Sequence, residues 1–317
     1  MFPYIDFHCD TLMQAQVQNR GDIVHAPELM VDIKRLRKSG CMAQFFAMFM
    51  WPQPKTSDCD DDRYIDDMLR IFQNSCGEEL ALARNLQEYR QNREAGKISG
   101  FLTLEDGRAV EGSMEKLERF YEKGVRLISL TWNYVNCFGS PNSFDPAVMA
   151  QGLSDFGKDA VVRMQELGML VDVSHLSDGG FWDVVELTKR PFVASHSNCR
   201  ALNPHARSMT DEMIRALADR GGIMGVNFSP LFLRQDIHDP GSRIADHVRH
   251  LRHMVQVGGV ECAAIGSDLD GIEGDLEIGS ADQIPLLFQA MEQAGFLSSE
   301  IEQIAWKNAE RVLAELK

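Results

Sequence analysis

Residues 170–196 read LVDVSHLSDGGFWDVVELTKRPFVASH. Two short apolar runs, Leu170–His175 and Phe192–His196, have the length and composition of buried strands, and each ends in a histidine. A helix-length segment separates them, which predicts a strand–helix–strand unit with parallel strands. Both histidines would then lie at the same edge of the sheet.

The same alternation of short apolar runs and helical patterns extends along the whole chain. Six more runs are candidate strands: Tyr4–His8, Met42–Met50, Phe101–Glu105, Arg126–Thr131, Ile223–Phe228 and Ala263–Asp268. Eight such units within 317 residues fit a closed α/β barrel of the (β/α)8 TIM type, which takes about 250 residues. A doubly wound open sheet is the alternative. With no linker or internal repeat, we expect a single domain over residues 1–317.

Cap and end signals mark several of the helices between these strands. The predicted helices with such signals are Ser113–Lys123, Asp155–Leu167, Thr210–Arg220 and Ser298–Lys317. The long segment Asp61–Lys97 is mostly helical in pattern, and we expect two helices there.

Composition excludes some classes of protein. A net charge of −15 argues against nucleic-acid binding, which needs a basic surface. No stretch reaches the roughly 18–20 apolar residues of a membrane span, and the N-terminus does not resemble a signal peptide. The seven cysteines form no regular pattern, which indicates reduced thiols. We therefore expect a cytoplasmic protein that is not bound to a membrane.

Residues of metal-ligand type gather at the predicted strand ends. His8 and Asp10 lie two residues apart, so on an extended chain they share one face while Cys9 points away and packs elsewhere. The others end strands and would meet them at one rim of a barrel: Glu105, His175, His196 and Asp268. Three imidazoles and three carboxylates suit zinc or another borderline divalent ion.

The other histidines favour an ordinary structural interpretation. His25, His205 and His238 lie in segments with a loop-like pattern. Three more share one face of a helix, which we expect to be a partly solvated outer face rather than a metal site: His247, His250 and His253.

Five segments together resemble the renal, or membrane, dipeptidase family of the amidohydrolase superfamily. They are DFHCDTL (6–12), LTLEDG (102–107), LVDVSHLSD (170–178), VASHSNCRAL (193–202) and GSDLDG (266–271), in the family's order. The resemblance implies a zinc-dependent dipeptidase that hydrolyses small dipeptides with a hydroxide bridging two metal ions. It also suggests a homodimer, whereas the secretion and lipid-anchor signals of the animal members do not appear here.

The resemblance also implies roles for individual residues. His8 and Asp10 would hold one ion, His175 and His196 the other, and Glu105 would bridge both. Asp268 would carry the proton between nucleophile and leaving amine, which is general acid–base chemistry. Arg207, in the segment RSMTDE, would hold the C-terminal carboxylate of the substrate.

One segment departs from the family. Its best-known members have a histidine after the fourth strand that stabilises the oxyanion, and this chain has Trp132 there. Asn133 or Asn136 is a candidate donor in its place. Two alternative functions remain at this stage: another amidohydrolase, such as a cyclic amidase or deaminase, and a barrel without catalysis that binds metal.

Overall fold

The computed structural model describes all residues except 1, 51–60 and 236–237. Its strands form one parallel sheet in the order β2-β1-β9-β8-β7-β6-β5-β4-β3, and an additional pairing of β2 with β4 closes the sheet into an eight-stranded barrel. The strands are β1 (Tyr4–Cys9), β2 (Cys41–Phe49), β3 (Leu80–Leu82), β4 (Ile98–Glu105), β5 (Val125–Ser129), β6 (Leu170–Asp172), β7 (Val193–Ser197), β8 (Ile223–Val226) and β9 (Ala263–Ile265). The predicted (β/α)8 barrel is therefore confirmed.

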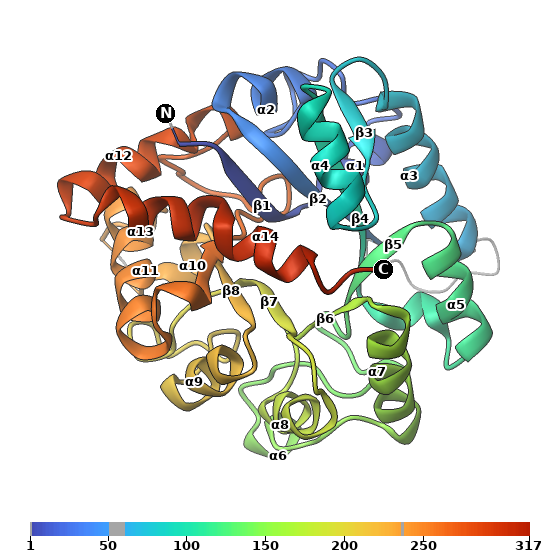
Figure 1. The fold of residues 1–317 in the computed structure, drawn as a ribbon. Helices are drawn as coiled ribbons and strands as arrows, with labels where there is room; N and C mark the ends of the chain where they lie inside the picture. The colour runs from blue at the N-terminus through green and yellow to red at the C-terminus, as the bar shows by residue number, and fades with distance from the viewer. Residues whose placement is uncertain (1, 51–60, 236–237) are drawn as a thin grey trace.

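Helices surround the barrel, as Figure 1 shows. They are α1 (Thr11–Val17), α2 (Ile33–Ser39), α3 (Asp61–Ser75), α4 (Leu86–Glu94), α5 (Met114–Glu122), α6 (Pro146–Met149), α7 (Asp155–Leu167), α8 (Asp178–Leu187), α9 (Asp211–Asp219), α10 (Pro230–Leu233), α11 (Ile244–Gly258), α12 (Pro285–Gln293), α13 (Ser298–Glu302) and α14 (Asn308–Leu313). A π-helical segment, Gln303–Lys307, joins α13 to α14, and the short 3₁₀ turns are Gly107–Val110, Val260–Cys262 and Ala281–Gln283. None of the helices of the described residues has the length and apolar composition needed to cross a bilayer.

Polar caps and a glycine bound two of the predicted helices. Ser154 accepts a hydrogen bond from the Gly157 N–H at the start of α7, and Gly168 ends that helix with φ 75°. Thr210 caps α9 by accepting from the Met213 N–H. The segment 61–97 contains the two expected helices, but also β3, which the sequence pattern did not predict. Strand β3 pairs with residues 98–100 of β4, and β5 pairs with β4 from Leu102 onward.

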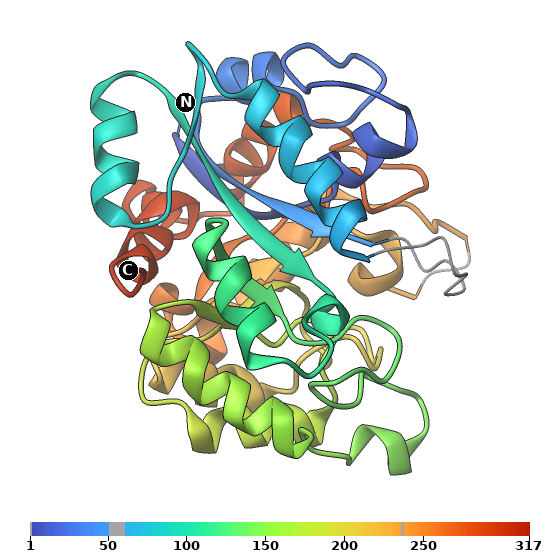
Figure 2. The ribbon, with the colours of Figure 1, turned by 90° about the vertical axis from the view of Figure 1, so that its right-hand side faces the viewer.

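Apolar side chains fill the barrel, and the C-terminal helix covers one end of it. The Phe45 ring stacks between two others, with its centroid 4.4 Å from that of Phe7 and 4.7 Å from that of Phe101. The same buried cluster includes Val312 and Leu313 of α14. In Figure 1 α14 crosses the barrel, and Figure 2 shows the strands running away from the side where it lies. The carboxyl ends of the strands are thus left to form a site at the opposite end.

The sequence interpretation of two histidines needs correction. His247 and His250 of α11 are fully buried, not partly solvated. The His247 ring stacks on Phe228 at 4.4 Å, and the His250 Nδ1 accepts a hydrogen bond from the Cys199 N–H, so this helix face packs against the barrel.

The six cysteines of the described residues are all free, and Cys59 lies outside those residues.

Candidate metal centre

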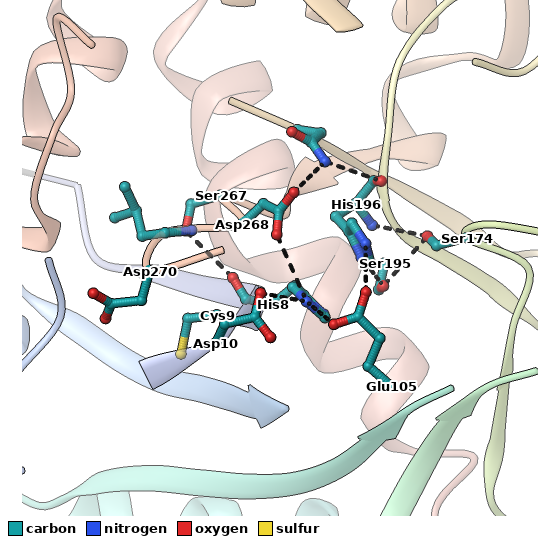
Figure 3. Close-up of polar contacts among 12 residues, drawn as sticks. His8, Cys9, Asp10, Glu105, Ser174, Ser195, His196, Ser267, Asp268 and Asp270 are labelled. Atoms are coloured by element: carbon teal, nitrogen blue, oxygen red, sulfur yellow. Dashed lines mark hydrogen bonds and ion pairs between the residues drawn. The ribbon is translucent and has the colours of Figure 1, made fainter. Parts of the chain in front are cut away.

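A bulge in β1 aims His8 into the barrel. Residues 6–9 of β1 span the same length as residues 44–46 of β2, so β1 carries one extra residue. Such a bulge shifts the alternation of side chains. As a result, Phe7 and His8 both face the interior although they are consecutive, while Cys9 packs in the outer core. Figure 3 shows the Cys9 sulfur directed away from the site.

Glu105 lies at the middle of the cluster, at the end of β4. Its Oε2 is 3.2 Å from the His8 Nε2, and its Oε1 is 3.1 Å from the His175 Nε2 and 3.5 Å from the His196 Nε2. The Nε2 atoms of His175 and His196 are 3.1 Å apart. One carboxylate therefore faces a single histidine on one side and a pair on the other.

Asp10 and Asp268 complete the group on the side of His8. The His8 Nε2 lies 3.6 Å from the Asp10 Oδ2 and 3.8 Å from the Asp268 Oδ1. The other oxygen of Asp268, Oδ2, accepts a 2.8 Å hydrogen bond from Asn227. The six predicted residues are all buried and all come together.

Two of the strands that carry site residues end earlier than predicted. Strand β6 ends at Asp172 and β9 at Ile265, so His175 and Asp268 stand three residues beyond their strands. Both have left-handed backbones, with φ of 69° and 62°. These conformations are costly for residues other than glycine, and such strain is typical of functional sites.

The donor set fits divalent cations. Two groups each have ligand atoms within 4.8 Å of one another, and they share His8: His8, Glu105 and His196, and His8, Asp10 and Asp268. Neither ring nitrogen of His8 makes a hydrogen bond within the described residues, which is unusual for a buried imidazole. A Cβ at Gly271 would lie 2.0 Å from the Asp10 Oδ2, so only glycine leaves room for that carboxylate.

The electrostatics of the site also favour a bound cation. Burial lowers the pKa of His175 to about 4 and that of His196 well below its usual value, so both rings are neutral and able to ligate near neutral pH. Burial alone would lower the pKa of His8, but Glu105 and Asp10 outweigh it and raise that pKa well above its usual value. Without metal, His8 therefore supplies the positive charge that the carboxylates need.

Arg207 is buried beside the site, at 5% exposure. Its guanidinium donates to the Ser197 Oγ at 2.9 Å and to the His196 carbonyl oxygen at 2.8 Å, and it lies 5.6 Å from the centre of the Phe232 ring. Burial lowers its pKa to about 10, so it stays protonated near neutral pH. Within the described part of the chain, no carboxylate forms an ion pair with it. Burying a guanidinium without a carboxylate partner costs folding free energy, unless a bound ligand supplies the negative charge.

The two candidate asparagines are in different environments. Asn133 lines the main cavity, and its Oδ1 lies 3.2 Å from the His175 Nδ1. Asn136 is outside the cavity lining, and its amide donates to Asp106 and to the Leu130 carbonyl oxygen. The structure therefore does not bring Asn136 to the site, because its hydrogen bonds are used within its own loop.

A cavity of about 590 Å³ opens onto the cluster. Trp132 forms part of its apolar wall and packs against Phe49, with ring centroids 5.1 Å apart. Other apolar residues of the wall are Met13, Leu29, Met30, Leu231, Phe232 and Ile272. The volume is within the usual range for small-molecule sites.

The sequence interpretation missed several residues behind the ligands. Asn227 contacts Asp268, and Ser195 contacts His196 with its Oγ 2.7 Å from the Nδ1. Asp6, within β1, and Asp172, the last residue of β6, are fully buried carboxylates in apolar segments of the sequence. That placement was the available signal, because a carboxylate is seldom fully buried without a polar partner.

A parallel barrel with buried imidazoles and carboxylates at the carboxyl ends of its strands defines a metal-dependent hydrolase. The chain belongs to the membrane dipeptidase family, peptidase family M19, whose family model matches residues 1–317. This membership and the fold make the protein a metallodipeptidase.

The chain is similar in sequence to two further proteins and in fold to a solved structure. An uncharacterised protein in the pqqA 5′ region of Klebsiella pneumoniae is 34% identical over 251 residues, which cover 77% of this chain and 91% of that protein. An uncharacterised dipeptidase of Schizosaccharomyces pombe is 28% identical, covering 98% of this chain and 82% of its own. The fold is similar to that of a metallopeptidase of Rhodobacter sphaeroides liganded with a phosphinate mimic of L-Ala-D-Ala. Its TM-score is 0.87 at 24% identity, and the match covers 100% of this chain and 99% of that one.

Proposed function

We propose that this protein hydrolyses dipeptides with a free C-terminal carboxylate at a centre of two divalent ions, with zinc as the metal. The observation that carries the proposal is the contact of Glu105 with His8 on one side and with His175 and His196 on the other. A carboxylate in that place has an oxygen for each ion of a pair about 3.5–4 Å apart. His8 and Asp10 would hold the first ion, and His175 and His196 the second.

The metals and the chain contribute different parts of the chemistry. When bound, the ions would act as Lewis acids and would activate a water molecule as the nucleophile near neutral pH. The protein would hold the ions, orient the substrate and move one proton. The apolar wall that includes Phe49 and Trp132 would limit the access of bulk water to the reacting carbonyl.

Asp268 is the residue that we propose for proton transfer. Burial raises the pKa of its carboxyl to about 6 in the metal-free site, and a nearby divalent ion would lower it. Its Oδ1 faces His8 and the cavity, while its Oδ2 is held by Asn227. It can therefore accept a proton from the nucleophile and deliver it to the leaving nitrogen without moving from the site.

We propose that Arg207 selects dipeptides over longer peptides by binding the C-terminal carboxylate. A dipeptide differs from a longer peptide in having a carboxylate one residue beyond the scissile bond. Arg207 has no carboxylate partner of its own among the described residues, and its planar group can bind both oxygens of a carboxylate. The dipeptide mimic bound by the Rhodobacter sphaeroides metallopeptidase supports ligands of this size.

The test compares free and C-terminally amidated dipeptides in wild type and Arg207→Ala. We expect wild type to cleave the free dipeptide and to act poorly on tripeptides and amides. Arg207→Ala should lose about 2–5 kcal/mol of transition-state stabilisation in kcat/KM for the free dipeptide, the scale of breaking a buried charged pair. Activity on the amide should change much less. Equal cleavage of both substrates by wild type would reject the carboxylate role and favour a cyclic amidase.

A further inference from the structure

Asp172 forms a clamp between β6 and β7. Its Oδ1 accepts from the Ser174 N–H at 3.0 Å and from the Ser195 N–H at 2.8 Å, and its Oδ2 accepts from the Ser195 hydroxyl at 2.6 Å. The Ser129 hydroxyl donates to the same Oδ2 at 2.5 Å. All of these groups are buried, so the carboxylate is held by four donors from β5, β7 and the turn after β6.

A second clamp repeats this arrangement between β1 and β9. The Asp6 Oδ1 accepts from the His8 N–H at 3.3 Å and from the Ser267 N–H at 2.8 Å, and its Oδ2 accepts from the Ser267 hydroxyl at 2.6 Å. In each clamp the aspartate bonds the N–H two residues ahead of it. Each also accepts from the N–H and the hydroxyl of one serine, which is Ser195 of β7 for Asp172 and Ser267, two residues after β9, for Asp6.

The clamps lie where the backbone ladder of the barrel is sparse. Strands β1 and β9 share a single register pair, Asp6 with Ile265, and β6 and β7 share a single pair, Asp172 with Val193. In both cases the clamped serine stands two residues after the paired residue. The side-chain bonds therefore hold the strands together just before the residues of the metal centre, His196 and Asp268.

Only the Asp172 clamp contacts the imidazole ring of a proposed metal ligand, His196. The Ser195 Oγ lies 2.7 Å from the His196 Nδ1 (Figure 3). The Ser195 hydroxyl has one proton and donates it in the hydrogen bond to Asp172. Toward His196 the hydroxyl oxygen can therefore only accept a hydrogen bond. The His196 Nδ1 must then be the protonated nitrogen, and Nε2 has its lone pair free toward Glu105 and His175.

We infer that Asp172 and Ser195 are positioning residues of the metal centre, which act on the bound ion by fixing the ring orientation and tautomer of His196. The inference rests on the metal-binding part of the proposed function. Partners of this kind contribute about 10–100-fold to metal affinity in other proteins.

The test is stepwise binding of Zn²⁺ to the metal-free protein in competition with a chromophoric chelator. Ser195→Ala removes the acceptor of the His196 proton and should weaken one binding step by about 10–100-fold. Ser129→Ala is the matched control, because it removes a donor from the same oxygen of Asp172 without touching a histidine. It should bind Zn²⁺ like wild type while losing similar thermal stability. Ser195→Thr, which keeps the hydroxyl, should restore the affinity.

Visible absorption of the Co²⁺-loaded protein gives a second readout. Ser195→Ala should change the ligand-field bands, and Ser129→Ala should leave them unchanged. If Ser195→Ala does not fold, Ser195→Cys replaces it, since a thiol is a weaker acceptor. Wild-type affinity in the Ser195 variant, or an equal loss in Ser129→Ala, would overturn the inference. Neither readout requires dipeptide hydrolysis, so a failure of the proposed activity is seen separately.

Discussion

Asp268 differs from the other carboxylates of the centre in how its backbone is held. Its φ of 62° is maintained by two hydrogen bonds, from its own N–H to the His8 carbonyl oxygen and from the Gly271 N–H to its carbonyl oxygen. The strain fixes the carboxylate at the rim of the cavity rather than in the strand. A fixed position close to the reacting atoms is what a proton carrier needs.

Asp268→Asn should therefore impair catalysis more than metal binding. The amide cannot carry the proton, so we expect a loss of at least about 100-fold in kcat, the usual contribution of general acid–base catalysis. Far-UV circular dichroism and metal content should stay close to wild type. Steady-state kinetics on metal-loaded protein make the measurement.

Asp106→Asn is the control for this variant. Asp106 is a buried carboxylate next to Glu105 in the sequence, but it accepts hydrogen bonds from Asn136 and from the Arg108 N–H instead of facing the cavity. It should retain most of its kcat. A kcat near wild type in Asp268→Asn would remove Asp268 from the proposed mechanism.

At the scale of elements, the sequence predicted the strands well because they follow a local pattern, and it placed the candidate residues of the metal centre near the strand ends. Short apolar runs between helical segments located all eight barrel strands, and each ligand lies at or within three residues of a strand end. The missed strand β3 has only three residues, too few to show a period. The burial of His247 and His250 was missed because it depends on Phe228 and Cys199, which are distant in sequence.

The buried histidine His247 of α11 should make stability depend on pH. Burial lowers its pKa to about 3 in the folded protein, whereas an unfolded histidine titrates near 6.5. Below about pH 6.5 the unfolded chain binds a proton that the folded protein does not, so stability falls as the pH falls. Between pH 7 and pH 5 this group should cost about 2 kcal/mol.

Urea unfolding of His247→Gln at the two pH values checks this expectation. The variant should lose less stability than wild type on going from pH 7 to pH 5. Ser242→Ala is the control, because it removes the hydroxyl 3.0 Å from the His247 Nε2 and keeps the imidazole. It should show the wild-type pH dependence. The same pH dependence in all three proteins would contradict the argument.

The C-terminal helix α14 should contribute to stability without affecting the chemistry. Leu313 is fully buried in the cluster that closes the barrel opposite the site. Leu313→Ala should cost about 2–5 kcal/mol of unfolding free energy, the usual range for a buried leucine. Leu297→Ala, at a position 65% exposed just before α13, should change it by less than about 0.5 kcal/mol. A drop in kcat/KM at a temperature where Leu313→Ala is fully folded would contradict the separation of the two ends.

At the scale of the whole molecule, the barrel gathers candidate site residues that are distant in the chain. His8 and Asp268 are separated by most of the sequence, and they meet because β1 and β9 are neighbours in the closed sheet. Strand order could be predicted from the alternation of strands and helices. The twin clamps could not, because they depend on register, and a shift of one residue would turn each serine to the other face.

Metal removal should therefore destabilise the barrel as well as stop catalysis. The centre joins β1, β4, β7 and the segments after β6 and β9, so an ion bound there would stabilise the folded state over the unfolded chain. The gain in unfolding free energy is RT ln(1 + [L]/Kd), about 2.7 kcal/mol when free metal is 100 times Kd.

A strong chelator should abolish dipeptide hydrolysis and lower the Tm, and added Zn²⁺ should restore both, with about two ions per chain by elemental analysis. Full activity in the chelator, with no metal in the protein, would reject the metal centre. A lost activity with an unchanged Tm would instead show that the ions bind too weakly to support the fold.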